Sequence, residues 1–327
     1  MDKYMETRIG TNWEEAAHFL LLNEVVAIPT ETVYGLAGNA LSENAILKIF
    51  KVKNRPHFNP LIIHTWNWDA IRAYVKNVPA EADKIANQFC PGPITFLLEK
   101  KNIIPDLVTA GFHKVAIRIP AHGLTQQLLK ALPFPLAAPS ANRFGYVSPT
   151  TAEHVVQGLD GIIPYILDGG ACKVGVESTI IDFEGDDVII RRKGGITAEA
   201  IGEIIGRTVL TRTHASDHPV APGQLKSHYA TQTPLFTETT PELQKIFAGK
   251  KIAKIAFGTV IQGDADYIFN LSPSADIDEA ARNLFAMMRQ ADNCGADIIF
   301  ANLLPETGLG AAINDRLKRA AQNNKSI

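Results

Sequence analysis

The chain of 327 residues contains only three cysteines, Cys90, Cys172 and Cys294, and they lie far apart. An odd number of widely spaced cysteines argues against a disulfide framework, and their spacing matches no metal-binding pattern. No apolar run approaches the roughly 18 residues needed to cross a bilayer. The amino-terminal segment is polar and acidic, unlike a signal peptide. We therefore expect a protein of the reducing cytoplasm, with no membrane span and no protein-held metal.

The usual nucleotide and zinc motifs are also missing. The sequence has no G-x-x-x-x-G-K-[ST] and no H-E-x-x-H, and "GLGAA" at 308–312 is an incomplete G-x-G-x-x-G. This fragment is more typical of the start of the last helix. Nothing in the sequence therefore predicts a P-loop ATPase or a zinc protease of the common types.

Excess positive charge is absent as well. The net charge is −2, with 20 Lys+Arg against 22 Asp+Glu in residues 1–210 and 12 against 12 in the remainder. A protein that binds nucleic acid through its phosphates needs a basic surface. Strong direct tRNA binding is therefore not expected, and any anion site must be local.

Hydrophobic periodicity predicts a sheet with helices packed on it in the first two thirds of the chain. The helix near 11–24 is expected to begin with a capping box of Thr11 and Glu14. Further helices are expected at 42–53, 67–89 with a break near Pro79, 122–131, 151–157 and 197–205. Apolar runs predict strands at 25–28, 61–64, 94–99, 115–120, 136–142, 165–170, 178–183 and 188–192. Several strands follow one another directly, which favours a mixed sheet over a simple βαβ repeat.

Residues 208–233 show neither helical nor strand periodicity and contain prolines, a glycine and small polar residues. Such a stretch is typical of a linker or a functional loop. Beyond it, strands alternate with amphipathic helices, which predicts a small parallel α/β domain. The expected organisation is a first domain at 1–207, a linker at 208–233 and a second domain at 234–327.

Polar side chains cluster where the predicted strands begin or end. "PTETVYGL" (29–36) follows the strand at 25–28, although Thr-Glu-Thr is also ordinary turn chemistry. "KVKNRPHFNPLIIH" (51–64) holds Lys53, Arg55 and Asn59 in a proline-bounded loop. A solvated helix end is the alternative, but Arg55-Pro56 and Asn59-Pro60 fix an extended backbone that presents these side chains in one direction. Arg118 lies inside the apolar strand "VAIRIP" and needs a partner or a ligand. Together these donors indicate a pocket for a polyphosphate.

The motifs occur in a recognisable order. "PTETVYGL", "KNR" (53–55), "NPL" (59–61), "AIRIP", "PSANRFG" with "SPT" (148–150), and "VESTIID" followed by "RRKGG" closely resemble the YrdC-like threonylcarbamoyl-AMP synthase family. "APGQLKSHYA" (221–230) and the second domain resemble its longer, two-domain form. The resemblance implies an open twisted mixed α/β sheet with a concave, locally positive cavity, and a small parallel, Rossmann-like carboxy-terminal domain.

The resemblance also implies a reaction and its partners. L-threonine, bicarbonate or CO₂, and ATP with Mg²⁺ would give L-threonylcarbamoyl-AMP and pyrophosphate. A downstream transferase would then use the product to modify the tRNA adenosine beside the anticodon. Catalysis of this kind needs proximity, in-line geometry and charge neutralisation more than a covalent nucleophile. Glu31 is expected to be a structural hydrogen-bond acceptor and not a general base.

The resemblance assigns residues of this chain to two binding sites. Threonine would contact Thr32, His64, Arg118, Ala138 and Ser178. ATP would contact Lys53, Arg55, Asn59, Lys114, Ser140, Asn142, Ser148, Arg192 and Tyr229. The chain departs from the family pattern at Lys114, where a hydroxyl is common, and at "HYAT". It also has "RRKGG" in place of Arg-Pro-Gly-Gly, and strand alternation lets only one of Arg191 and Arg192 face the pocket.

The sequence leaves the class of function and the role of Tyr229 open. The chain could instead be a double-stranded RNA-binding module or an enzyme that uses carbamoyl phosphate. Tyr229 could act as part of a lid over ATP or merely pack between the domains. We expect the second domain to bury a face against the first and to position the linker, without a catalytic group of its own.

Overall fold

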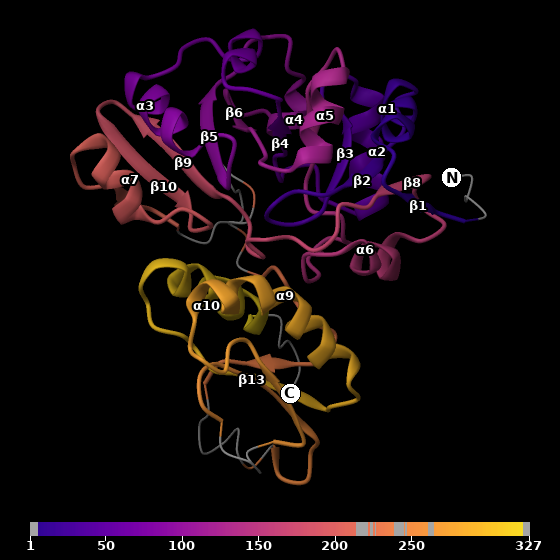
Figure 1. Cartoon of the computed structure of the whole chain (residues 1–327), viewed down its shortest axis with the longest axis vertical. Helices are drawn as coiled ribbons and strands as arrows, with labels where there is room; N and C mark the ends of the chain where they lie inside the picture. Colours follow the sequence, from indigo (N-terminus) through magenta and orange to yellow (C-terminus); the bar gives the residue numbers. More distant parts are fainter. Residues whose placement is uncertain are drawn as a thin grey trace.

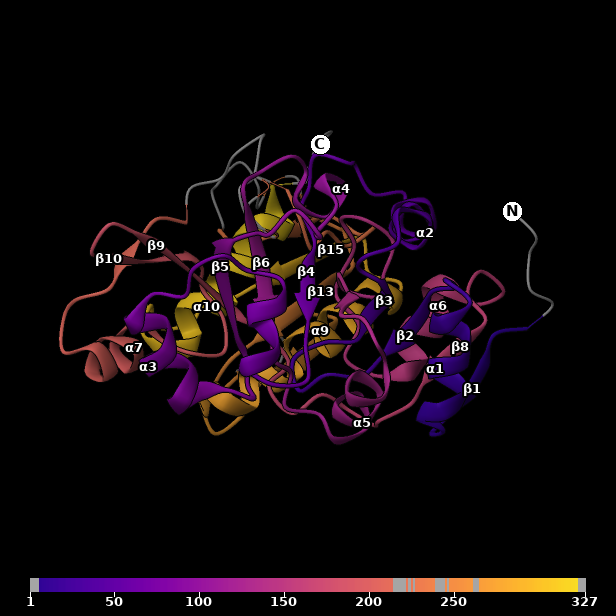
Figure 2. The same ribbon diagram turned by 90° about the horizontal axis from the view of Figure 1, so that it is seen from above.

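The computed structural model describes residues 6–213, 222, 225, 227–238, 245, 247–260 and 265–322. The first domain lies at the top of Figure 1 and the carboxy-terminal domain at the bottom, with the helices α9 (Ile277–Asn293) and α10 (Gly308–Ala321) between the two sheets. Seen from above, the first domain lies over the second (Figure 2). Within the described part of the chain, no helix is long and apolar enough to cross a bilayer.

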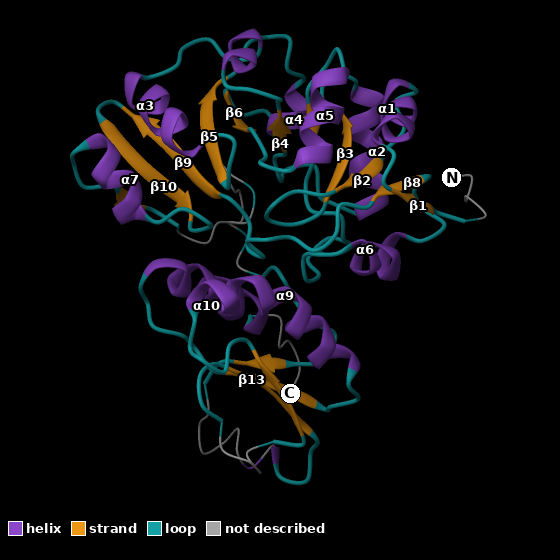
Figure 3. Ribbon diagram, viewed as in Figure 1, coloured by secondary structure: helices purple, strands orange, loops and turns teal. Residues whose placement is uncertain are grey.

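An 11-stranded sheet forms the frame of the first domain (Figure 3). Parallel pairs such as β4–β6 and β5–β9 alternate with antiparallel pairs such as β5–β6 and β9–β10, so the predicted mixed sheet is confirmed. In spatial order its strands are β1 (Arg8–Gly10), β8 (Tyr165–Leu167), β2 (Val26–Ile28), β3 (Gly35–Asn39), β7 (Leu136–Ala137), β4 (Ile62–His64), β6 (Lys114–Arg118), β5 (Ile94–Glu99), β9 (Thr179–Glu184), β10 (Asp187–Arg192) and β11 (Leu210–Thr211).

Helices of the first domain pack on this sheet, and their starts follow capping chemistry. The predicted cap of the first helix is wrong by one residue, because Asn12 and not Thr11 accepts the backbone N–H of Glu14, at 2.8 Å. Ser42 caps the second helix as expected. The helices are α1 (Trp13–Leu21), α2 (Glu43–Lys53), the 3₁₀ turn η1 (Asp69–Ala73), α3 (Ala80–Phe89), α4 (Asp106–Thr109), α5 (Gly123–Ala131), α6 (Ala152–Leu159) and α7 (Ala198–Ile205).

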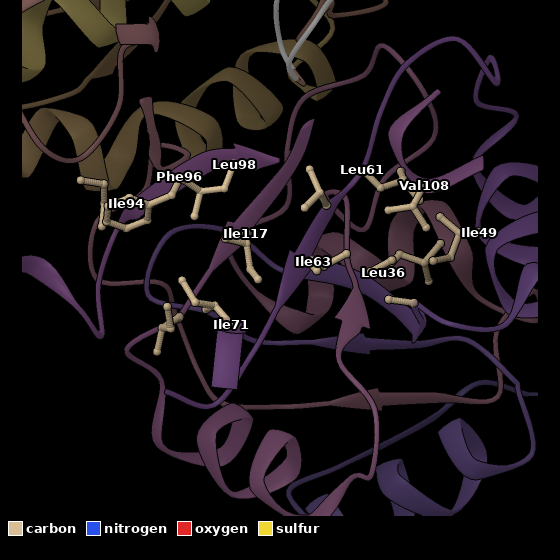
Figure 4. Packing of buried hydrophobic residues seen from close by; sticks show 14 of the residues in the cluster. Leu36, Ile49, Leu61, Ile63, Ile71, Ile94, Phe96, Leu98, Val108 and Ile117 are labelled. Carbon is tan, nitrogen blue, oxygen red and sulfur yellow. The ribbon is translucent and has the colours of Figure 1, made fainter. Parts of the chain in front are cut away.

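Strand alternation gives the centre of the sheet one face in the main core and a second face with mixed apolar and polar residues, which include a small apolar cluster of Ile62, Leu97, Ala116 and Ile180. Ile63 and Ile117 belong to the main core with Phe96, as Figure 4 shows. The next residues along their strands, His64 and Arg118, point to the opposite face because successive strand side chains alternate. One face of these strands is therefore buried in the main core, while the other face carries His64 and Arg118.

The second domain has a four-stranded parallel sheet, as predicted from its alternating pattern. The strand order is β12 (Leu235–Phe236), β15 (Ile298–Ala301), β13 (Ile252–Ala256) and β14 (Tyr267–Asn270). Val33, Val147 and Val176 of the first domain share an apolar cluster with Phe285 of α9 and Ile313 of α10. The expected burial of one face against the first domain is thus confirmed.

Candidate functional site

Two neighbouring strands bring His64 and Arg118 side by side. His64 of β4 pairs with Arg118 of β6, and Thr95 of β5 lies on the other side of Arg118. His64 and Arg118 are 2% and 4% exposed. Ala138 follows β7, which pairs with β4, and it lines the same pocket as His64 and Arg118. The sheet therefore assembles three of the predicted threonine-binding residues on one wall.

Two further arginines line this pocket. The proline-bounded loop folds back on Arg55, which donates to the carbonyls of Asn59 at 3.2 Å and Pro60 at 2.8 Å. Arg192 donates to the carbonyl of Ser178 at 3.1 Å and to its hydroxyl at 3.0 Å. Burial lowers the pKa of Arg55 to about 9, assisted by the charge of Arg192, and burial lowers that of Arg192 to about 10. This concentration of positive charge suits an anionic ligand.

A β-bulge settles which arginine of "RRKGG" faces the pocket. The register between β9 and β10 shifts between Ile190 and Arg192, so simple alternation fails there. Arg192 lines the pocket, whereas Arg191 pairs with Asp182 at 2.7 Å and with Glu184.

Arg118 is not an unpaired cation, because Glu31 balances it. The Oε1 atom of Glu31 lies 2.7 Å from Nη2 of Arg118, and its Oε2 accepts the N–H of Ala121 at 3.0 Å. Glu31 is therefore a structural acceptor, as expected. The contact with Arg118 is an ion pair without hydrogen-bond geometry, so Nε and Nη2 of Arg118 stay buried with no hydrogen bond. These two donors can still receive a carboxylate.

His64 supplies a neutral group to the same wall. Burial, followed by the charge of Arg118, lowers its pKa to about 3, so the imidazole is uncharged near neutral pH. Its Nδ1 atom is buried without a hydrogen bond. The ring can therefore exchange a hydrogen bond with a small polar ligand beside Arg118.

Three described residues of the linker contribute to the pocket. Pro222, His228 and Tyr229 line it together with the sheet residues. The ring of Tyr229 also stacks on Phe285 of α9, with ring centres 5.5 Å apart, so it both lines the pocket and packs between the domains. The free volume is about 50 Å³. Ligand pockets hold several hundred Å³, so the pocket in this conformation is too small for a ligand of nucleotide size.

Ser140 lines the pocket directly. Two other predicted serines form hydrogen bonds with residues that line the pocket. Ser178 exchanges a hydrogen bond of 2.7 Å with Thr95, besides its contacts with Arg192. Ser148 donates to Oε1 of Glu177 at 2.8 Å.

Lys53 lies beneath the loop that carries Ser140. Its ammonium donates to the carbonyls of Ser140 and Asn142, both at 2.5 Å, and the side chain is 1% exposed. The amide of Asn142 donates to the carbonyls of Arg143 and Tyr146, and Asn142 lines a separate cleft on the α6 and α9 side. The structure thus gives Lys53 a supporting position and does not bring Asn142 into the pocket lining.

Three predicted residues lie at or beyond the margin of the site. Thr32 is fully buried and bonds to Thr30 at 2.9 Å. Asn59 is fully buried beside Arg55, with both side-chain polar atoms unbonded. Lys114 begins β6 and donates to Asp182 at 2.6 Å, outside the pocket lining.

Sequence reasoning missed several contributors. Val33, Pro139 and His228 line the pocket and stand directly beside predicted residues, so proximity in the motifs was their signal. Glu177 lines it too and stands directly before the predicted residue Ser178. Arg316 of α10 contacts Glu177, and nothing in its regular amphipathic helix pointed to this contact.

Comparisons with known proteins agree with this architecture. The Sua5/YciO/YrdC family model, described as "Telomere recombination", matches residues 18–194, and a model described as "Threonylcarbamoyl-AMP synthase, C-terminal domain" matches 196–322. Threonylcarbamoyl-AMP synthases of Pyrococcus abyssi and Bacillus subtilis are 39% and 38% identical, each over 94% of this chain and 93% and 92% of their own lengths.

A solved structure shares the whole arrangement. The crystal structure of P. abyssi Sua5 complexed with L-threonine superposes with a TM-score of 0.88 and 38% identity, covering 95% of this chain and 94% of that one. The match includes both domains. The chain therefore belongs to the threonylcarbamoyl-AMP synthase family and is an enzyme of its two-domain, Sua5 type.

Proposed function

We propose that the chain condenses L-threonine, CO₂ or bicarbonate, and ATP into L-threonylcarbamoyl-AMP with release of pyrophosphate. The product would pass to a downstream transferase that modifies the tRNA adenosine beside the anticodon. The observation that carries the proposal is the meeting of Arg55, Arg118 and Arg192 in one pocket. Glu177, which lines the pocket, and Glu31, which contacts Arg118, are each already paired with an arginine.

The positions suggest a division of roles. Arg118 would bind the threonine carboxylate and His64 a neighbouring polar group. Arg55 and Arg192, which approach from other elements, would bind the nucleotide phosphates. Threonine and the α-phosphate would then lie between them, which is the proximity that the reaction requires.

The chemistry follows from this placement. The neutral amine of threonine attacks CO₂ and loses a proton, which gives a carbamate. A carbamate oxygen then attacks the α-phosphorus, the bond to the β-phosphate oxygen breaks, and pyrophosphate leaves with the electron pair. The protein would hold the partners in line, neutralise the phosphate charge and exclude water.

Mg²⁺ is proposed to enter with ATP and to share the charge of its phosphates. Mg²⁺ in such sites is held largely by phosphate oxygens and water, with few protein carboxylates. Among the described residues, no group of three or more His, Cys, Asp or Glu side chains is arranged to hold a metal ion.

Pyrophosphate release tests the reaction. The chain with ATP and Mg²⁺ should release pyrophosphate only when both threonine and bicarbonate are present. Leaving out either substrate, or replacing bicarbonate by carbamoyl phosphate, should abolish release. Release that persists without threonine, or that requires carbamoyl phosphate, would contradict the proposal.

Arg55→Ala should weaken ATP binding by about tenfold or more, because hydrogen bonds to charged groups contribute about 1.5–3 kcal/mol. Threonine affinity should change little. Lys53→Ala should also weaken ATP more than threonine, since Lys53 supports the Ser140 loop. Calorimetry on both variants measures the two affinities. Parent-like ATP binding by both would remove this loop from the nucleotide site.

A further inference from the structure

A single arginine of the second domain reaches the edge of the pocket. Arg316 belongs to α10 and is fully buried. Its Nε donates to Oε2 of Glu177, 139 residues earlier in the chain, at 3.0 Å, and its Nη1 donates to Asp315 at 3.1 Å. The guanidinium also lies 5.5 Å from the ring centre of Tyr229. Arg316 therefore contacts two residues that line the pocket.

Glu177 extends this contact to a predicted nucleotide-binding residue. One of its carboxylate oxygens accepts from Arg316 and the other accepts the hydroxyl of Ser148 at 2.8 Å. All three residues are at most 7% exposed. The result is a buried hydrogen-bond network that extends from the second domain to the wall of the pocket.

The charge of Glu177 makes these hydrogen bonds between Arg316, Glu177 and Ser148 important for an anionic ligand. An ionised carboxylate at the wall of the pocket would repel a polyphosphate unless a cation balances it. Burial, the largest single effect, raises the pKa of Glu177, but the charges of Arg316 and then Arg192, together with hydrogen bonds such as that from Ser148, lower the pKa overall. Without Arg316, Glu177 would depend on Arg192, which the phosphates also need.

We propose that Arg316 is a positioning residue of the nucleotide site, which acts by neutralising Glu177 and thereby fixing Ser148 and leaving Arg192 available to phosphate. The inference rests on the proposed function, because it assumes that ATP occupies this pocket. It gives the second domain a defined electrostatic role in addition to its packing face. Arg316 does not need to touch a substrate for this role.

Arg316→Met in the full chain tests the proposal, since methionine keeps an unbranched apolar side chain and removes the charge. ATP affinity measured by calorimetry should fall by about tenfold. Threonine affinity should stay within about twofold, because Arg118 and His64 do not contact Arg316. Unchanged ATP affinity would overturn the role of Arg316.

Arg289→Met is the matched control. Arg289 is also a buried arginine of the second domain, and it bridges to the first domain by donating to the carbonyl of Val147 at 2.5 Å. It does not line the pocket that holds Arg55 and Arg192. ATP affinity should therefore remain parent-like in this variant. An equal loss in both variants would show that ATP binding responds to domain contact in general, against the proposal.

Glu177→Gln separates charge from packing. If Arg316 acts through Glu177, then Arg316→Met introduced into the Glu177→Gln protein should change ATP affinity by less than about twofold. This double variant also removes both members of a buried pair, which is far less destabilising than removing one. It therefore serves if Arg316→Met alone does not fold. A tenfold loss of ATP affinity in the Glu177→Gln background would refute the proposal that Arg316 acts through Glu177.

Ligand binding by the unmutated parent protein distinguishes a failure of the proposed function from a failure of the role of Arg316. If the parent binds neither ATP nor threonine, the proposed function itself fails. If the parent binds both and Arg316→Met binds ATP equally well, only the positioning role fails.

Discussion

A chain that ends after residue 207 should lose at least about tenfold of its synthetic activity even when its first domain stays folded. The main core, which contains residues such as Ile63, Phe96 and Ile117, lies within residues 25–209, and Val209 is the only one of its described members that the cut removes. The cut removes Pro222, His228 and Tyr229, which line the pocket. Water would then reach an intermediate that hydrolyses easily. The measurement is threonine-dependent pyrophosphate release, with folding checked by circular dichroism.

Tyr229→Ala in the full chain should reproduce much of this loss, because it removes the ring that covers the pocket while leaving both domains present. Tyr229 has a positive φ of 64°, and alanine carries the same backbone strain there, so strain does not confound the comparison. Tyr229→Phe keeps the ring and should retain most activity. A truncated domain that works at the full rate would show that the linker is only a tether.

Arg118→Ala should weaken threonine binding by about 10- to 100-fold, since a hydrogen-bonded charge pair contributes about 1.5–3 kcal/mol and each 1.4 kcal/mol is tenfold. ATP binding should be affected much less. The ion pair with Glu31 adds a second consequence. Removal of Arg118 leaves Glu31 as a buried carboxylate without its partner, so the variant should also unfold at a lower temperature.

The double variant Arg118→Ala/Glu31→Gln separates binding from stability. It removes both charges and should recover most of the lost thermal stability, yet it should still bind threonine weakly. Calorimetry and thermal unfolding on both variants give the two readouts. Recovery of threonine affinity in the double variant would mean that Arg118 only balances Glu31 and does not bind the substrate.

Local patterns were sufficient for most of the elements. The apolar runs predicted β4, β5, β6, β9 and β10, and Ser42 correctly marked the start of α2. Strands that lack an apolar run escaped prediction. β3 has the sequence "GLAGN", which has no strand pattern, and it exists because β2 and β7 pair with its two edges. Such strands depend on partners that are distant in the sequence.

The motifs also predicted that His64, Arg55 and Arg118 belong together, because strand ends and proline-bounded turns have directions that follow from local sequence. They could not show which arginine of "RRKGG" turns inward. A β-bulge next to Arg192 determines this, and the bulge arises from pairing with β9.

Charge balance was decided by the tertiary structure alone. Lys53 was predicted to bind ATP, with a solvated helix end as the alternative, but it is buried and donates to the carbonyls of Ser140 and Asn142. Arg118 meets Glu31, and Glu177 meets Arg316 from the other domain. Electrostatic energy depends on the distance between charges and on their burial, and only the folded chain sets these quantities for residues so far apart in the sequence.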